Sequence, residues 1–247
     1  MPQNQAICQL YRLFADILEY PTPALRERAH ECAAQLLPVN AEAAGHLEAF
    51  AAWVEETPPG RLEEIYTGTF DLQVVCYPYV GYHLFGESYK RGAFLAKLNE
   101  EYRSRGFSAE TELPDHLAVI LRFLAVLHDE DLERDLITEC VVPALNRMQQ
   151  VFKGKTDPYG EVIRALSLVF QGVSAVETAP TLRQAQDVAS AKRRPEPVEG
   201  SPSGDWSSAG AGRLREGDVL RSLPSLLRGL SKGCRDFNRQ AVATQEE

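Results

Sequence analysis

Apolar residues recur every three or four positions along most of this chain, between breaks that contain proline or glycine. The first stretch places Ile7, Leu10, Phe14 and Ile17 on one face of a helix, and Pro21 ends it. No segment shows the alternation of apolar and polar residues that is typical of a strand. The pattern predicts an all-α fold, with helices over residues 6–20, 24–37, 41–56, 62–70, 90–105, 113–128, 131–152 (bent at Pro143) and 157–171.

The most apolar of these helices should be the central one. Its residues from Leu117 to Leu127 are apolar except for Arg122, and the run is shorter than the roughly 20 residues that a membrane helix needs. Pro114 is tolerated in a first helical turn, and the carboxylate of Asp115 would meet the positive end of the helix dipole. We therefore expect this helix to begin near Leu113 and to be buried nearly all round.

Residues 71–89 differ from the helical pattern. They contain four tyrosines, a proline and two glycines among few charges, so we interpret them as an irregular or lid-like connection. Aromatic residues with polar tips suit a binding surface, although a buried cluster would expose no ring. Tyr66 and Phe70, which are spaced i and i+4, are expected to be more core than site, and the wider aromatic set adds Tyr77, Tyr79, Tyr82, Phe85 and Tyr89.

Three regions are predicted along the chain. Residues 1–172 form one helical domain, and residues 173–212 form a flexible low-complexity insertion or linker rich in glycine, proline and serine. Within it, residues 183–200 resemble the in-frame translation of a dispersed bacterial DNA repeat. Residues 213–247 carry a leucine stripe from Leu220 to Leu230, which suggests a C-terminal helix and tail that docks back or engages a partner.

Composition narrows the class of protein. The net charge of −9 argues against a nucleic-acid-binding or anionic-membrane surface. The N-terminus lacks the features of a secretory signal, and five scattered cysteines fit reduced thiols, so we expect a cytoplasmic protein. No pair of cysteines has the CxxC spacing of a structural zinc site, and we predict no metal or cofactor of its own.

Catalysis is the weaker hypothesis. Cys76 with His83 and His116 could form a nucleophile and base or part of a metal site, but the apolar neighbours of Cys76 favour a buried packing residue. Asp115 and His116 are adjacent on a predicted helix, where they would point about 100° apart. We read Asp115 as a dipole carboxylate and His116 as a residue that lines a groove. No Walker loop, GxGxxG, HExxH or GxSxG motif occurs.

Three separate motifs carry a family resemblance. They read LEEIYTGTFDL from Leu62, YHLFGESYKRG from Tyr82 and ELPDHL from Glu112, followed by the apolar helix. In this order they resemble the NarJ branch of the TorD/DmsD-like chaperones, the assembly factors of respiratory nitrate reductase. The resemblance covers about residues 6–171, and it does not extend to residues 183–212.

The resemblance implies a non-catalytic, all-helical cytoplasmic chaperone. Such proteins bind the N-terminal region of the nitrate reductase catalytic subunit, support insertion of its molybdenum cofactor and delay membrane docking until assembly is complete. By motif, the implied partner-binding residues are Tyr66, Phe70, Asp71, His83, Gly86, Glu87, Arg91, Gly92, Asp115 and His116. An acidic helical body with an aromatic strip could hold a basic amphipathic peptide, which agrees with this reading.

Two other readings stay open at this point. A small hydrolase or metal-dependent enzyme would use Cys76, His83 and His116. A signalling adaptor would bind other helices through the stripe from Leu220 to Leu230.

Overall fold

The computed structural model describes residues 2–72, 74–109 and 112–177, and every regular element in these ranges is a helix. This confirms the all-α prediction for the described part of the chain. The helix predicted over residues 157–171 continues to Glu177, so the first five residues of the predicted linker are helical. The rest of the linker, from residue 178, and the leucine stripe lie outside the described residues. In chain order the elements are α1 (Pro2–Ile17), α2 (Leu25–Leu36), α3 (Ala41–Glu56), α4 (Pro59–Phe70), α5 (Val80–Phe85), α6 (Tyr89–Ser104), α7 (Leu117–Leu124), α8 (Glu130–Leu136), the π-helical turn η1 (Ile137–Val141), α9 (Val142–Phe152) and α10 (Tyr159–Glu177).

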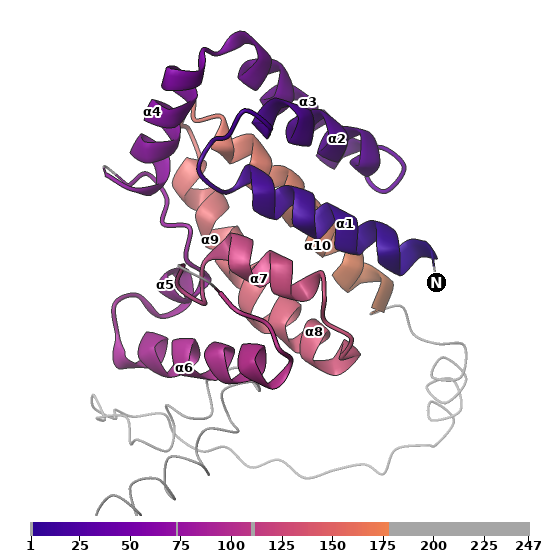
Figure 1. Cartoon of the computed structure of the whole chain (residues 1–247), viewed down its shortest axis with the longest axis vertical. Coiled ribbons are helices and arrows are strands. Elements are labelled where there is room, and N and C mark those ends of the chain that lie inside the picture. The colour runs from indigo at the N-terminus through magenta and orange to yellow at the C-terminus, as the bar shows by residue number, and fades with distance from the viewer. Residues whose placement is uncertain (1, 73, 110–111, 178–247) are drawn as a thin grey trace, which may run out of the picture.

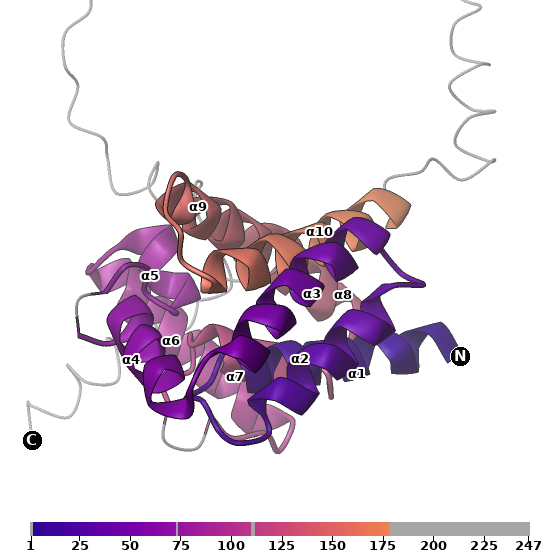
Figure 2. The ribbon, with the colours of Figure 1, turned by 90° about the horizontal axis from the view of Figure 1, so that it is seen from above.

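The helices pack around one apolar core. α3 packs against α2 and α10, and α1 packs against α2 and α7. The short helix α5 contacts α6, α9 and η1. In Figure 1, α1 to α4 occupy the upper part of the molecule and α5 to α8 the lower part, and Figure 2 shows α10 running beside α3. None of the helices in the described ranges is long and apolar enough to cross a membrane.

Helix α7 is buried nearly all round, as its sequence predicts. Every residue of α7 except Arg122 is buried. The guanidinium of Arg122 donates hydrogen bonds to the carboxylates of Asp16, at 3.0 Å, and of Glu19, both of which belong to or follow α1. These bonds satisfy the one charged side chain of α7, so the helix can be buried without leaving a cation unpaired.

The predicted start of α7 is wrong. The helix begins at Leu117, and residues 113–116 form a turn instead. The backbone N–H of Leu117 donates to the carbonyl of Pro78 (2.8 Å), and the carbonyl of Asp115 accepts from Val80 (2.8 Å). These backbone groups are therefore engaged by residues 78–80. Asp115 precedes the N-cap residue His116, so it does not act as the first-turn dipole carboxylate that the sequence suggested.

The predicted helix 131–152 is interrupted. It consists of α8, η1 and α9, with Pro143 at the start of α9 directly after the π-helical turn. Proline lacks the N–H of an α-helical hydrogen bond, and its ring clashes with the carbonyl four residues earlier. A π-helical turn is one of the recognised ways in which a helix relieves such a break. The expected irregularity at Pro143 is present in this form.

The connection over residues 71–89 is irregular at both ends but contains the helix α5, which the sequence pattern did not predict. Gly86 ends α5 with a positive φ of 62°. Such a backbone is favourable for glycine and strained for most other residues.

Candidate functional site

The second and third motifs meet in one buried ion pair. Arg91 on α6 donates from Nε to Oδ2 of Asp115 at 2.9 Å and from Nη2 to Oδ1 at 3.3 Å. The Asp115 side chain is completely buried, whereas the Arg91 side chain is 17% exposed. A two-point contact between a guanidinium and a buried carboxylate fixes the relative position of both elements.

Two tyrosine rings lie near the guanidinium of this pair. The guanidinium carbon of Arg91 lies 5.2 Å from the ring centre of Tyr79 and 5.9 Å from that of Tyr82. Tyr79 also forms the isolated backbone bridge to His116, and the two rings meet edge to face at 5.5 Å. The structure thus brings together three predicted site residues, Arg91, Asp115 and His116, with two tyrosines of the irregular segment.

Gly81 is the part of this arrangement that needs a glycine. A Cβ at this position would lie 2.7 Å from Oδ2 of Asp115 and 2.9 Å from Cδ1 of Phe94. Both distances are too short for ordinary contact, so α5 can approach the ion pair only because Gly81 has no side chain. We call Tyr79, Gly81, Arg91, Asp115 and His116 the motif junction.

His116 caps α7 and does not line a groove, which corrects the expectation from sequence. Its side chain is only 4% exposed, and its Nδ1 accepts a hydrogen bond from the backbone N–H of Ala118 at 3.2 Å. Burial is the main cause that lowers the pKa of His116, to about 4. The ring is therefore neutral at physiological pH, as an acceptor in a helix cap must be.

This cap predicts a pH dependence of stability. Between pH 6.5 and about 4 the unfolded state binds a proton at His116 while the folded state does not. The free energy of unfolding should therefore fall as pH falls through this window, by about 3 kcal/mol in the limit. The variant His116→Asn keeps a capping acceptor without the titration. Urea unfolding at pH 7 and pH 4.5 should show a smaller loss in this variant, and equal losses would contradict the assignment.

Cys76 and His83 do not form a catalytic pair. Their Sγ and Nε2 atoms are 3.8 Å apart, but Nε2 of His83 lies 2.8 Å from the carbonyl of Tyr77 and must donate to it. That nitrogen therefore has no free lone pair with which to take a proton from the thiol. Burial raises the pKa of Cys76 to about 12. Both observations weigh against the hydrolase reading.

Alkylation checks this conclusion. At pH 8 iodoacetamide should label Cys76 of the folded protein slowly, because its thiol is buried and protonated. Cys8, which is partly exposed, should react faster. Mass spectrometry of tryptic peptides gives both rates. Labelling of Cys76 faster than Cys8 would restore it as a candidate nucleophile, and equal rates after unfolding in urea serve as the control.

The other predicted site residues are dispersed. Tyr66 and Phe70 are buried on α4 and pack on the ring of Tyr159, at 5.8 and 5.0 Å between ring centres. This agrees with the expectation that they belong to the core more than to a site. Three others are exposed: Asp71 follows α4, Glu87 follows α5, and Gly92 lies on α6.

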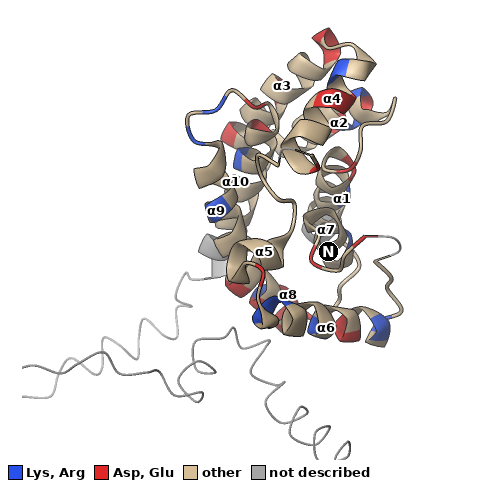
Figure 3. Cartoon of the chain, turned by 90° about the vertical axis from the view of Figure 1, so that its left-hand side faces the viewer, with Lys and Arg blue, Asp and Glu red and all other residues tan. Residues whose placement is uncertain are grey.

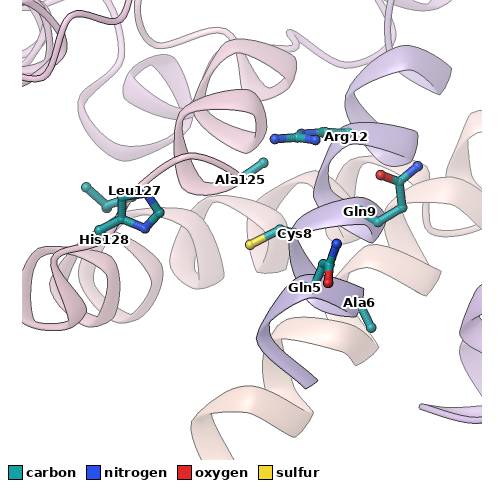
Figure 4. A pocket seen from close by; sticks show the side chains of 8 residues that line it. All are labelled: Gln5, Ala6, Cys8, Gln9, Arg12, Ala125, Leu127 and His128. Carbon is teal, nitrogen blue, oxygen red and sulfur yellow. The ribbon is translucent and has the colours of Figure 1, made fainter. Parts of the chain in front are cut away.

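Two cavities lie apart from the motif junction. One of about 700 Å³ lies between α1 and the end of α7, where Cys8, Arg12 and His128 line it (Figure 4). Another of about 400 Å³ lies beside α4, and Thr69 and Asp157, which are hydrogen-bonded at 2.7 Å, line it. Within the described ranges, no group of three or more His, Cys, Asp or Glu residues could hold a metal ion.

The motifs identified Arg91, Asp115 and His116 as site residues, but nothing in the sequence indicated that their side chains lie together. The sequence pattern includes Tyr79 and Tyr82 only as members of an aromatic set, and Gly81 only as one of two glycines in residues 71–89. Tyr102 lies in the helix predicted over residues 90–105, and its hydroxyl donates to the carbonyl of Pro114 at 2.8 Å, a contact that the sequence pattern did not predict. No local sequence pattern predicts the backbone hydrogen bonds between residues 78–80 and residues 115–117.

Comparison with known proteins decides the family. Residues 35–162, which include all three motifs, match the model of the nitrate reductase delta subunit family. The chain belongs to this family. The resemblance to NarJ-type proteins that the motifs predicted is thereby confirmed.

The chain is also similar to one relative by sequence and to one solved structure. Over 128 residues it is 28% identical to a Bacillus subtilis (strain 168) protein assigned as the nitrate reductase molybdenum cofactor assembly chaperone NarJ, covering 51% of this chain and 68% of the relative. A crystal structure assigned to a redox enzyme maturation protein from Archaeoglobus fulgidus matches with a TM-score of 0.47 and 23% identity. That match covers 67% of this chain and 93% of the other.

Proposed function

We propose that this protein is an assembly chaperone of nitrate reductase that works in the cytoplasm. In this proposal it binds the N-terminal region of the catalytic subunit, supports insertion of the molybdenum cofactor and delays membrane docking until assembly is complete. The observation that carries the proposal is the family match over residues 35–162, together with the assignment of the Bacillus subtilis relative as a NarJ chaperone.

The structure supports a role in binding. In the motif junction, Arg91 and Asp115 are paired and His116 caps α7. These side chains therefore stabilise the local backbone and are not free for acid-base chemistry. The segment that the junction positions exposes aromatic rings, Tyr77 at 37% and Tyr89 at 87%. Exposed rings on a fixed backbone give contact area at low entropic cost. The proposed mechanism is therefore binding and release, with no covalent step.

The partner should be basic and amphipathic. Residues 1–177 contain 26 acidic and 15 basic residues, and Asp71 and Glu87 flank the aromatic segment on the surface. Complementary charge would speed encounter with a basic segment, and the rings would hold its apolar face. Tyr66 and Phe70 would stabilise α4 beneath this surface, and Gly86 and Gly92 would let a partner backbone approach closely.

Complementation in cells tests the proposal. A strain without its nitrate reductase chaperone should accumulate a catalytic subunit with little molybdenum, and expression of this protein should restore the metal content. The variant Asp71→Lys with Glu87→Lys reverses two exposed charges and should restore it less well. Glu100→Lys, on the exposed side of α6, is the matched control. Failure of the folded wild-type protein to restore molybdenum with its cognate subunit would contradict the proposed function.

A further inference from the structure

Exposed acidic and apolar side chains come from three separate parts of the chain. Tyr20 follows α1, Glu63 and Asp71 belong to α4 and its end, and Glu112 precedes α7. The Tyr20 ring packs edge to face on Tyr66 at 5.5 Å. We call this surface the acidic aromatic face, and its members are Tyr20, Glu63, Asp71, Leu72, Glu112 and Leu113.

The carboxylates of this face act on neighbouring tyrosines. Partial burial and then the charges of Glu63 and Asp71 raise the pKa of Tyr20, whose hydroxyl is hydrogen-bonded to Glu63. Burial and then the charges of Glu112, Asp115 and Asp71 raise the pKa of Tyr79. The charge of Asp71 thus acts both on Tyr20 and on Tyr79 of the motif junction. Figure 3 shows the side of the molecule on which α4 lies.

Within the described ranges, the carboxylates of the face form no ion pair, and its apolar side chains are exposed. None of Glu63, Asp71 and Glu112 forms an ion pair with a described residue, whereas nearby Glu19 is paired with Arg122. Large apolar side chains are exposed beside them, with Leu72 at 81%, Tyr20 at 51% and Leu113 at 44% exposure. Unpaired like charges around exposed apolar side chains indicate a surface for a basic, apolar segment.

The chain itself contains such a segment. Residues 219–239 carry five basic residues and a single acidic one, together with a leucine stripe. The preceding residues 178–218 could span on the order of 130 Å when extended, so any face of the domain is within reach. Tethering also gives such a segment a high effective concentration at the domain. The basic residues are Arg221, Arg228, Lys232, Arg235 and Arg239, and the leucines are Leu220, Leu223, Leu226, Leu227 and Leu230.

We infer that residues 219–239 dock on the acidic aromatic face of the same molecule. The leucines cover Tyr20, Leu72 and Leu113, and the basic residues pair with Glu63, Asp71 and Glu112. The docked segment occupies the face as an internal competitor of other basic amphipathic segments. This last consequence rests on the proposed function, whereas the docking itself does not.

A zero-length cross-link tests the docking in the full-length protein. Lys232 is the one lysine of residues 219–239. Carbodiimide treatment should join it to Glu63, Asp71 or Glu112, and mass spectrometry should detect the linked peptides. The variant Leu226→Asp with Leu227→Asp should lose the link although it keeps Lys232. Tyr20→Ser with Leu72→Ser should lose it although it keeps the carboxylates.

The control is Val39→Ser, an exposed apolar residue beyond the opposite end of α2, which should leave the link unchanged. Mixing isotopically labelled and unlabelled protein separates links within one molecule from links between copies. Links within one molecule support the inference. Absence of the link, links to other carboxylates, or links only between copies would overturn it. Complementation by the wild-type protein decides the proposed function separately.

Discussion

Replacing Asp115 by alanine should lower the free energy of unfolding by about 2–4 kcal/mol. Loss of one partner from a buried ion pair leaves the other charge without compensation, which costs roughly 3–5 kcal/mol in a fully buried site. Arg91 is 17% exposed and can regain some hydration, so the expected cost is somewhat smaller. Urea unfolding followed by circular dichroism measures it.

The control for this prediction is an exposed pair. Arg61 and Glu64 are joined on α4 with side chains 55% and 67% exposed, so Glu64→Ala should cost less than about 1 kcal/mol. A double-mutant cycle on Arg91 and Asp115 should give a coupling energy well above that of the exposed pair. Equal costs for Asp115→Ala and Glu64→Ala would show that the motif junction does not stabilise the fold.

Substitution of Gly81 by alanine is the second large effect that we expect. The new Cβ would lie 2.7 Å from Oδ2 of Asp115 and 2.9 Å from Phe94, so the ion pair or α5 must move. Overpacking of this kind typically costs about 1–3 kcal/mol. Thermal unfolding should show a lower Tm, and the near-ultraviolet circular dichroism spectrum should change because the packing of Tyr79 and Tyr82 changes.

Gly92 provides a matched control on α6. A Cβ there would meet nothing within 4 Å, and the residue is exposed in a helix. Gly92→Ala should therefore be neutral or stabilising by up to about 1 kcal/mol, because alanine has the higher helix propensity. A loss of stability in Gly92→Ala as large as in Gly81→Ala would contradict the steric explanation.

The sequence predicted the helices well because their apolar spacing is local. α2 and α3 agree closely with residues 24–37 and 41–56, and α6 begins and ends within one residue of the prediction. The predicted and observed helix bounds differ where a tertiary contact determines the backbone conformation. Residues 113–116 have good signals for a helix start, yet the bridge to residues 78–80 uses their backbone groups and delays α7 to Leu117.

The candidate site shows the same division. Arg91 and Asp115 were identified by their place in motifs, but nothing in their local sequence says that they pair, since 24 positions separate them. The requirement for glycine at position 81 follows only from the packing of α5 on that pair. Cys76 shows the converse, because its apolar neighbours were enough to predict that it is buried.

Calorimetric titration with a peptide from the N-terminus of the nitrate reductase catalytic subunit tests whether this chain binds its proposed partner. We predict micromolar or tighter binding, about −8 kcal/mol, that weakens at higher salt, and no binding of a scrambled peptide. The variant Leu226→Asp with Leu227→Asp should bind at least as tightly as the wild type. Absence of binding by both folded proteins would contradict the claim that this chain recognises the catalytic subunit through that region.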